Sequence, residues 1–205
     1  MTAIKGPSLG DLRTTLARQV ETLVGRLDSW SADDWELPST NPGWSNADTV
    51  RHVITALSKY TVGVERREEA TRPAFETPSR LEEAPAARLP RLLADAGDSL
   101  VEALGKTEPT ETVWHTRRRF SARSMASVAL SEVVLHRWDL TGPGDRGPEP
   151  RAARLVLQGV FSSHDDSSAS PIALLLHVSG RVRMEGRPGW RGDDWRWDIV
   201  DEVPG

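Results

Sequence analysis

The chain of 205 residues contains no cysteine, and this absence excludes several kinds of chemistry at once. No disulfide framework can form, so the fold must depend on a packed core. No cysteine thiolate can act as a nucleophile or as a metal ligand. Any thiol that takes part in a reaction must therefore come from a bound small molecule.

Long apolar runs and an excess of positive charge are also missing. No run reaches the length of about 18 apolar residues that marks a membrane span. The N-terminal residues MTAIKGPSLGDLR lack the apolar segment of a signal peptide. The formal net charge of −4 gives no electrostatic footprint for nucleic acid. We therefore expect a cytoplasmic monomer or homodimer that binds neither nucleic acid nor a membrane.

Most of the first 140 residues consist of amphipathic segments in which apolar residues recur at helical spacing. Ser8 is a plausible N-cap for the first segment, and Ser45 with Asp48 forms a capping box for the second. Pro90 is expected in the first turns of the third segment. Residues 31–45 and 108–120 are expected to be loops, the latter with a short extended piece. The four expected helices span residues 8–30, 45–70, 86–107 and 121–140, a number and length typical of a four-helix bundle.

The pattern of apolar residues changes after a linker at residues 141–150, TGPGDRGPEP. Residues 151–161 resemble a helix, and residues 172–179, 181–186 and 194–200 resemble strands. Trp195 and Trp197 alternate with charged residues, as in a half-buried strand. Together with Trp190 they are expected to form the core of a small domain. We expect a mainly α protein, with a four-helix bundle over residues 1–142 and a small α/β domain over residues 150–205.

The segment LSEVVLHRWDL, residues 130–140, places a carboxylate and an imidazole on the apolar side of the fourth expected helix. Glu132 and His136 lie about 40° apart on a helical wheel and should both point into the bundle. An ionised carboxylate buried without a partner costs several kcal/mol, so Glu132 needs a cation or a set of donors. The two side chains can chelate one metal ion, as in other bundle-core sites. A hydrogen-bonded pair that fixes the packing fits the pattern as well.

Other polar residues near these helices admit two interpretations each. His52 lies off the main apolar stripe of its helix, on a face with small residues, which fits either a cleft or plain surface exposure. Asp139 can orient His136, or it can cap the helix or pair near Arg137. Trp44 is expected to pack within its turn, and no role is assigned to three further histidines. A basic run before the fourth helix can hold a substrate carboxylate or form a solvated loop; its residues are Arg117, Arg118 and Arg119.

Two motifs resemble the mycothiol-dependent maleylpyruvate isomerase family, which belongs to the DinB-like group of metal-binding four-helix bundles. The first is NPGWSNADTVRHV, in which a Pro-Gly-Trp turn precedes a helix that carries His52. The second is SEVVLHRWDL, in which Glu132 and His136 are followed by Asp139. The resemblance covers roughly residues 8–142. It implies that His52, Glu132 and His136 bind one divalent metal ion, usually zinc.

The resemblance also implies an enzyme with mycothiol as its thiol cosubstrate. Two histidines and one glutamate leave a zinc position open, as in catalytic sites. A thiol bound there loses its proton. The thiolate would add to, or displace a group from, a small electrophile, in a cis–trans isomerase or a thiol S-transferase. Two alternatives remain: a non-catalytic binding or regulatory bundle, and a metallohydrolase that needs no thiol.

Overall fold

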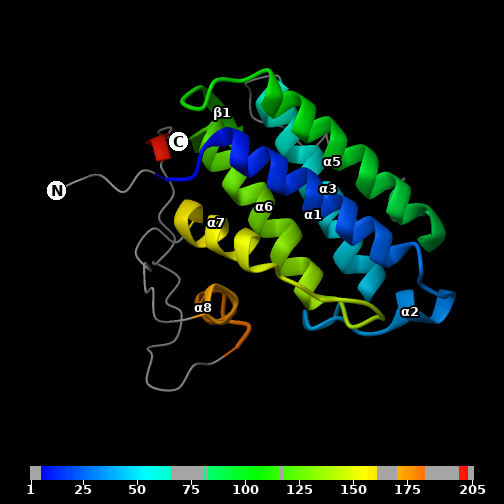
Figure 1. The fold of residues 1–205 in the computed structure, drawn as a ribbon. Helices are drawn as coiled ribbons and strands as arrows, with labels where there is room; N and C mark the ends of the chain where they lie inside the picture. The colour runs from blue at the N-terminus through cyan, green and yellow to red at the C-terminus, as the bar shows by residue number, and fades with distance from the viewer. Residues whose placement is uncertain are drawn as a thin grey trace.

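The computed structural model describes residues 6–65, residue 81, and residues 83–115, 118–160, 170–182 and 199–202. Its four long helices are α1 (Leu9–Leu27), α3 (Asn46–Glu65), α5 (Leu89–Gly105) and α6 (Ala122–Asp139). Helix α1 packs on α5 and α6, and α3 packs on the same two helices, so the four surround one apolar core (Figure 1). The expected four-helix bundle is confirmed.

Local sequence fixes the helix ends where the cap patterns predicted them. The Ser8 hydroxyl accepts a hydrogen bond from a backbone N–H in the first turn of α1. Ser45 and Asp48 form the reciprocal capping box at the start of α3, with distances of 2.9 and 3.1 Å. Ser121 caps α6 in the same way as Ser8 caps α1. Pro90 lies in the first turn of α5, after a single 3-10 turn at Ala86–Arg88.

Residues 31–45 contain a short helix that the loop assignment missed. Helix α2 (Ala32–Glu36) begins with a complete capping box between Ser31 and Asp34. Trp35 within it is buried and meets Trp30 edge to face, with ring centroids 5.0 Å apart. The cap and one buried tryptophan are enough to form a single helical turn among residues that otherwise favour turns.

A small antiparallel sheet lies at one end of the bundle. Strands β1 (Thr112–His115) and β2 (Arg118–Ser121) form a hairpin, and β3 (Ile199–Glu202) pairs with β2 from the far end of the chain. Of the strand expected at residues 194–200, only Ile199 and Val200 lie among the described residues, and both are in β3. The end of the chain therefore returns to the bundle.

Besides β3, the described part of the C-terminal region contains two helices. Helix α7 (Pro150–Val160) packs on α6, and α8 (Pro171–Val178) packs on α7 (Figure 1). The strand expected at residues 172–179 was wrong, because a short continuous apolar run has no period that separates a strand from a buried helix. Pro171 starts the helix instead. Residues 183–186 and the tryptophans 190, 195 and 197 lie outside the described residues, and the division into two domains stays a prediction.

Helix α6, which carries Glu132 and His136, is buried on almost every side. It contacts α1, α3, α7, β1 and β2. The side of α6 that carries Ser124, Ser127 and Ser131 is buried too. Helix α7 packs closely on it at Gly159, where an added Cβ would lie 2.3 Å from the Ser127 hydroxyl oxygen. The site residues therefore stand on a helix held from several directions. None of the described helices is long and apolar enough to cross a membrane.

Candidate metal centre

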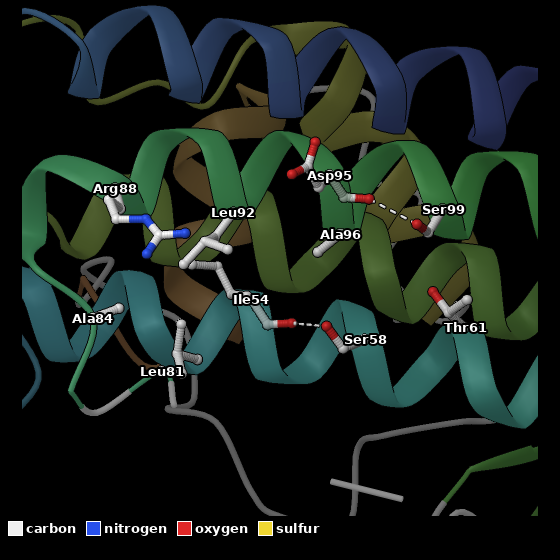
Figure 2. A pocket seen from close by; sticks show the side chains of 10 residues that line it. All are labelled: Ile54, Ser58, Thr61, Leu81, Ala84, Arg88, Leu92, Asp95, Ala96 and Ser99. Atoms are coloured by element: carbon white, nitrogen blue, oxygen red, sulfur yellow. Dashed lines mark hydrogen bonds between the residues drawn. The ribbon is translucent and has the colours of Figure 1, made fainter. Parts of the chain in front are cut away.

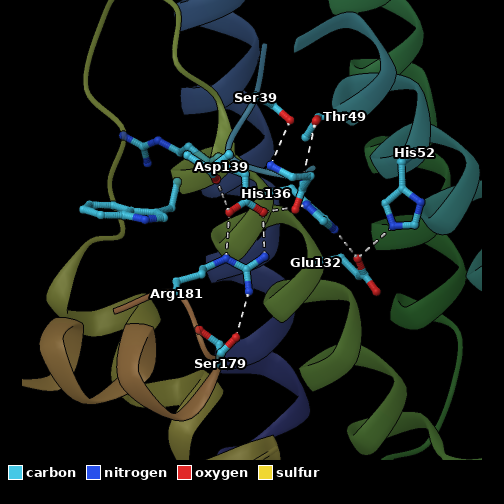
Figure 3. Close-up of polar contacts among 12 residues, drawn as sticks. Ser39, Thr49, His52, Glu132, His136, Asp139, Ser179 and Arg181 are labelled. Carbon is cyan, nitrogen blue, oxygen red and sulfur yellow. Dashed lines mark hydrogen bonds and ion pairs between the residues drawn. The ribbon is translucent and has the colours of Figure 1, made fainter. Parts of the chain in front are cut away.

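The structure brings the three side chains of the expected ligand set together. His52 comes from α3, and Glu132 and His136 come from α6 (Figure 3). The Glu132 Oε2 atom lies 3.5 Å from His52 Nε2 and 3.2 Å from His136 Nε2. One ligand atom from each residue falls within 4.8 Å of the other two. The face of α3 that carries His52 therefore turns toward Glu132 and His136 of α6.

This spacing fits a divalent metal ion. Ligand bonds of about 2.0–2.2 Å in a tetrahedral arrangement place neighbouring ligand atoms about 3.3–3.6 Å apart. The two measured separations, 3.5 and 3.2 Å, are close to that edge length. Imidazole nitrogens with one carboxylate oxygen suit zinc, and three protein ligands leave at least one position open.

Glu132 is ionised and receives donors on both of its oxygens. Burial raises the pKa of its carboxyl group, but hydrogen bonds from His136 and His52 outweigh that effect and hold the pKa well below its usual range. The Tyr60 hydroxyl donates to Glu132 Oε1 at 3.1 Å. Burial and the Glu132 charge raise the pKa of Tyr60 well above its ordinary value, so this hydroxyl stays protonated. Tyr60 was not expected at the site, because its position on the apolar stripe of α3 marks it as core.

Asp139 lies within hydrogen-bond distance of His136, as one of the two roles expected of it requires. Its Oδ2 atom lies 2.9 Å from His136 Nδ1. Burial raises the pKa of Asp139, but hydrogen bonds from His136 and Arg181 outweigh it and keep the carboxylate ionised. Burial lowers the pKa of His136, but the carboxylates of Asp139 and Glu132 outweigh it and raise the pKa. Arg137 takes no part, because it pairs with Asp145 and donates to Gln19.

His52 is the most exposed of the three ligand candidates, with 40% of its side chain accessible. The Trp44 ring lies against it, with centroids 5.1 Å apart, and the His136 ring meets it edge-on at 4.8 Å. Trp44 itself is 37% exposed, so it covers the histidine at the rim of the site rather than packing within its turn.

A cavity of about 250 Å³ opens beside Glu132 and His136. Apolar walls come from Val128 and Leu135, and the remaining lining residues are His115, Ser131 and Arg181. His115 lies between Tyr60 and Phe120, with ring centroids 5.2 and 5.1 Å away. Neither His115 nor Arg181 has a sequence spacing that relates it to the ligands, so sequence reasoning missed both.

The basic run at residues 117–119 is not seen at this cavity. Arg117 lies outside the described residues, and only the backbone of Arg118 is described, in β2. The Arg119 guanidinium lies over the Trp114 ring, 5.8 Å from its centroid, and does not line the cavity. The expected contact with a substrate carboxylate stays a prediction.

A larger cavity of about 570 Å³ lies between α3 and α5, and none of the three ligand candidates lines it (Figure 2). The hydroxyl groups of Ser58, Thr61 and Ser99 on its walls donate to backbone carbonyls of their own helices. The hydrogens of these three hydroxyl groups are thus occupied, and the smaller cavity is the one that adjoins two of the ligand candidates, Glu132 and His136.

Comparisons with known proteins agree with the two motifs. The family described as the mycothiol maleylpyruvate isomerase N-terminal domain matches residues 14–141. A crystal structure of the mycothiol-dependent maleylpyruvate isomerase aligns over 97% of this chain and 95% of its own, with a TM-score of 0.66 and 16% identity. A mutant of that enzyme aligns over 86% and 90%, with a TM-score of 0.64 and 16% identity. At that identity the likeness establishes the fold. No curated protein matches the sequence.

Proposed function

Because the chain belongs to the mycothiol maleylpyruvate isomerase N-terminal domain family, we propose that it is a metal-dependent enzyme that uses mycothiol against a small electrophile. His52, Glu132 and His136 are the proposed ligands of one divalent ion, with zinc favoured by the donor set. The same chemistry serves a cis–trans isomerase and a thiol S-transferase.

The observation that carries the proposal is the arrangement of charge around His136. Its Nδ1 atom faces the ionised Asp139 at 2.9 Å and therefore holds the proton. When the His136 ring is neutral, its Nε2 atom presents a lone pair to the ionised Glu132 at 3.2 Å. At that distance the two electron-rich atoms repel unless a proton on Nε2 or a bound cation lies between them. A divalent ion shared with His52 would take the place of that proton.

The residues around the centre have separate tasks. Glu132 supplies the negative charge that retains a cation, and the Tyr60 hydroxyl donates a hydrogen bond to its Oε1 atom. Asp139 holds His136 in the tautomer that leaves Nε2 available. The protein has no thiol of its own, and the adjoining cavity offers room for a small substrate. When bound, a divalent zinc ion lowers the pKa of a coordinated thiol until the proton leaves.

The two proposed reactions differ in the fate of the thiol. In the isomerase, sulfur adds to one carbon of a cis double bond, and the π electrons move onto the adjoining conjugated group. Rotation about the new single bond and loss of the same sulfur restore the double bond in the trans form, so no thiol is consumed. In the transferase, a leaving group departs with its bonding electrons, and one thiol is consumed for each turnover.

A metallohydrolase is less well supported, because hydrolysis needs a general base within reach of a bound water. Asp139 is the carboxylate nearest to the ligands along α6, and its oxygens already accept from His136, Arg181 and Thr40. It is also only 1% exposed. Asp139 therefore orients a ligand and is poorly suited to take a proton from water.

The test is turnover of a panel of electrophiles by zinc-loaded protein, with and without mycothiol. We expect product only when the thiol is present, and less product with a thiol that lacks the sugar part, because remote contacts help to position the sulfur. Zinc-stripped protein should be inactive until zinc is restored. Full turnover without any thiol would overturn the proposal and favour a hydrolase. Binding of mycothiol without turnover of any substrate would favour a non-catalytic module.

A further inference from the structure

An arginine from the C-terminal region lies directly behind the candidate metal ligand His136. The Arg181 guanidinium donates from Nε to Asp139 Oδ1 at 2.8 Å and from a terminal nitrogen to Oδ2 at 2.6 Å (Figure 3). The same Oδ2 atom contacts His136 Nδ1 at 2.9 Å. Arg181, Asp139 and His136 therefore form one continuous chain of polar contacts, which ends at the imidazole ring that carries the candidate ligand atom Nε2.

The local sequence aims Arg181 at this place. Helix α8 ends in a Schellman motif, in which the Arg181 N–H donates to the Leu176 carbonyl at 2.8 Å and the Gly180 N–H donates to the His177 carbonyl at 3.0 Å. Gly180 has a φ of +76°, the left-handed conformation that this motif requires. The turn reverses the chain after α8 and directs the Arg181 side chain toward the end of α6.

Asp139 needs this partner because it is almost fully buried. A two-point contact with an arginine neutralises the carboxylate and also fixes the plane of its two oxygens. A carboxylate fixed in this way sets the rotation of the His136 ring and keeps the proton on Nδ1. Thr40 adds one donor to Oδ1 at 2.9 Å, but a neutral hydroxyl leaves the charge uncompensated.

We propose that Arg181 is a positioning residue of the metal centre, which acts on His136 through Asp139. The inference rests on the proposed metal site and extends it beyond the family match, which ends at residue 141. On this account the C-terminal region completes the centre, although all three candidate ligands precede it. If the Arg181–Asp139 ion pair only attached α8 to the bundle, its loss would leave the affinity for the metal ion unchanged.

The experiment compares zinc affinity in the full-length protein and its variants, by competition with a chromophoric chelator. A visible spectrum of the Co²⁺-loaded protein gives a second readout, which reports the geometry of the ligands. The variants are Arg181→Met, Arg181→Gln and the conservative Arg181→Lys. The matched control is Arg151→Met, because Arg151 makes a similar long-range pair with Asp11 at 3.1 Å, is 61% exposed and lies away from the centre.

Arg181→Met is expected to weaken zinc binding by about 10–100-fold, the usual effect of losing a group that orients a ligand. Its Co²⁺ bands should shift or change intensity. Arg181→Lys should recover part of the affinity, because it restores the charge without the two-point contact. Arg151→Met should match the wild type in both readouts. If Arg181→Met does not fold, Arg181→Gln and Arg181→Lys carry the same comparison.

Wild-type affinity and spectrum in the Arg181 variants would overturn the inference and leave the proposed metal site intact. An equal loss of affinity in Arg181→Met and Arg151→Met would overturn it too, by reducing Arg181 to a general stabilising contact. A wild-type protein that binds neither zinc nor Co²⁺ would overturn the proposed metal site and this inference together.

Discussion

Removal of the metal ion is expected to destabilise the bundle where α3 meets α6, because one candidate ligand comes from α3 and two come from α6. Without the ion, Glu132 is a partly buried carboxylate that relies on Tyr60, His52 and His136, at 3.1, 3.5 and 3.2 Å. With the ion, the three ligands tie the two helices together. Chelation should therefore lower the midpoint of thermal unfolding, Tm.

The size of the effect follows from mass action. Free zinc at one hundred times its Kd stabilises the folded state by about 2.7 kcal/mol. Each kcal/mol shifts Tm by about 2–4 °C in domains of comparable size. For this chain of 205 residues, the expected fall in Tm on full chelation is therefore about 5–10 °C.

The assay is a thermal melt followed by circular dichroism, in buffered zinc and then in excess chelator. His52→Ala should show a much smaller response to chelator, because one of the three ligands is gone. Glu102→Gln should keep the full response, because Glu102 is an exposed residue of α5 that pairs with Lys106 on the surface, away from the three ligands. A wild-type Tm that does not change with chelator would exclude a stabilising metal ion and favour a hydrogen-bonded Glu132–His136 pair.

Two further predictions concern Trp44, which lies against His52, and Gly63, which lies further along α3. Trp44→Ala should weaken zinc binding several-fold and Trp44→Phe much less, because either aromatic ring can cover His52; equal affinities in an equilibrium titration would count against this. Gly63→Ala should lower the stability to urea by about 1–3 kcal/mol, because its Cβ would lie 2.0 Å from the Trp114 carbonyl oxygen. Gly25→Ala in α1, which meets nothing within 4 Å, should instead leave stability equal or slightly raised.

The parts of the fold that the sequence predicted are those with local signals. Caps such as Ser45 with Asp48 act within one helical turn, and helical periodicity placed Glu132 and His136 on one side of α6 before any contact was known. His52 was ambiguous on the wheel, and the motif resemblance was needed to include it. The folded structure places His52 beside Glu132 of α6, and Gly63 further along α3 lets the Trp114 backbone approach closely.

The parts that the sequence did not predict depend on distant contacts. Helix α8 was expected to be a strand, because its apolar run has no period, and only its packing on α7 decides the matter. The contact between Arg181 and Asp139 spans 42 residues and has no local pattern. The sequence gives no sign of the role of Tyr60, because a buried aromatic ring and a hydrogen bond from its hydroxyl to Glu132 are compatible on one side chain.

Elemental analysis of protein purified without added metal decides whether His52, Glu132 and His136 hold a metal ion. We expect about one divalent ion per chain, zinc above others, and a large loss of that ion in His136→Ala. Metal content that stays unchanged in His136→Ala would show that these residues are not the ligands.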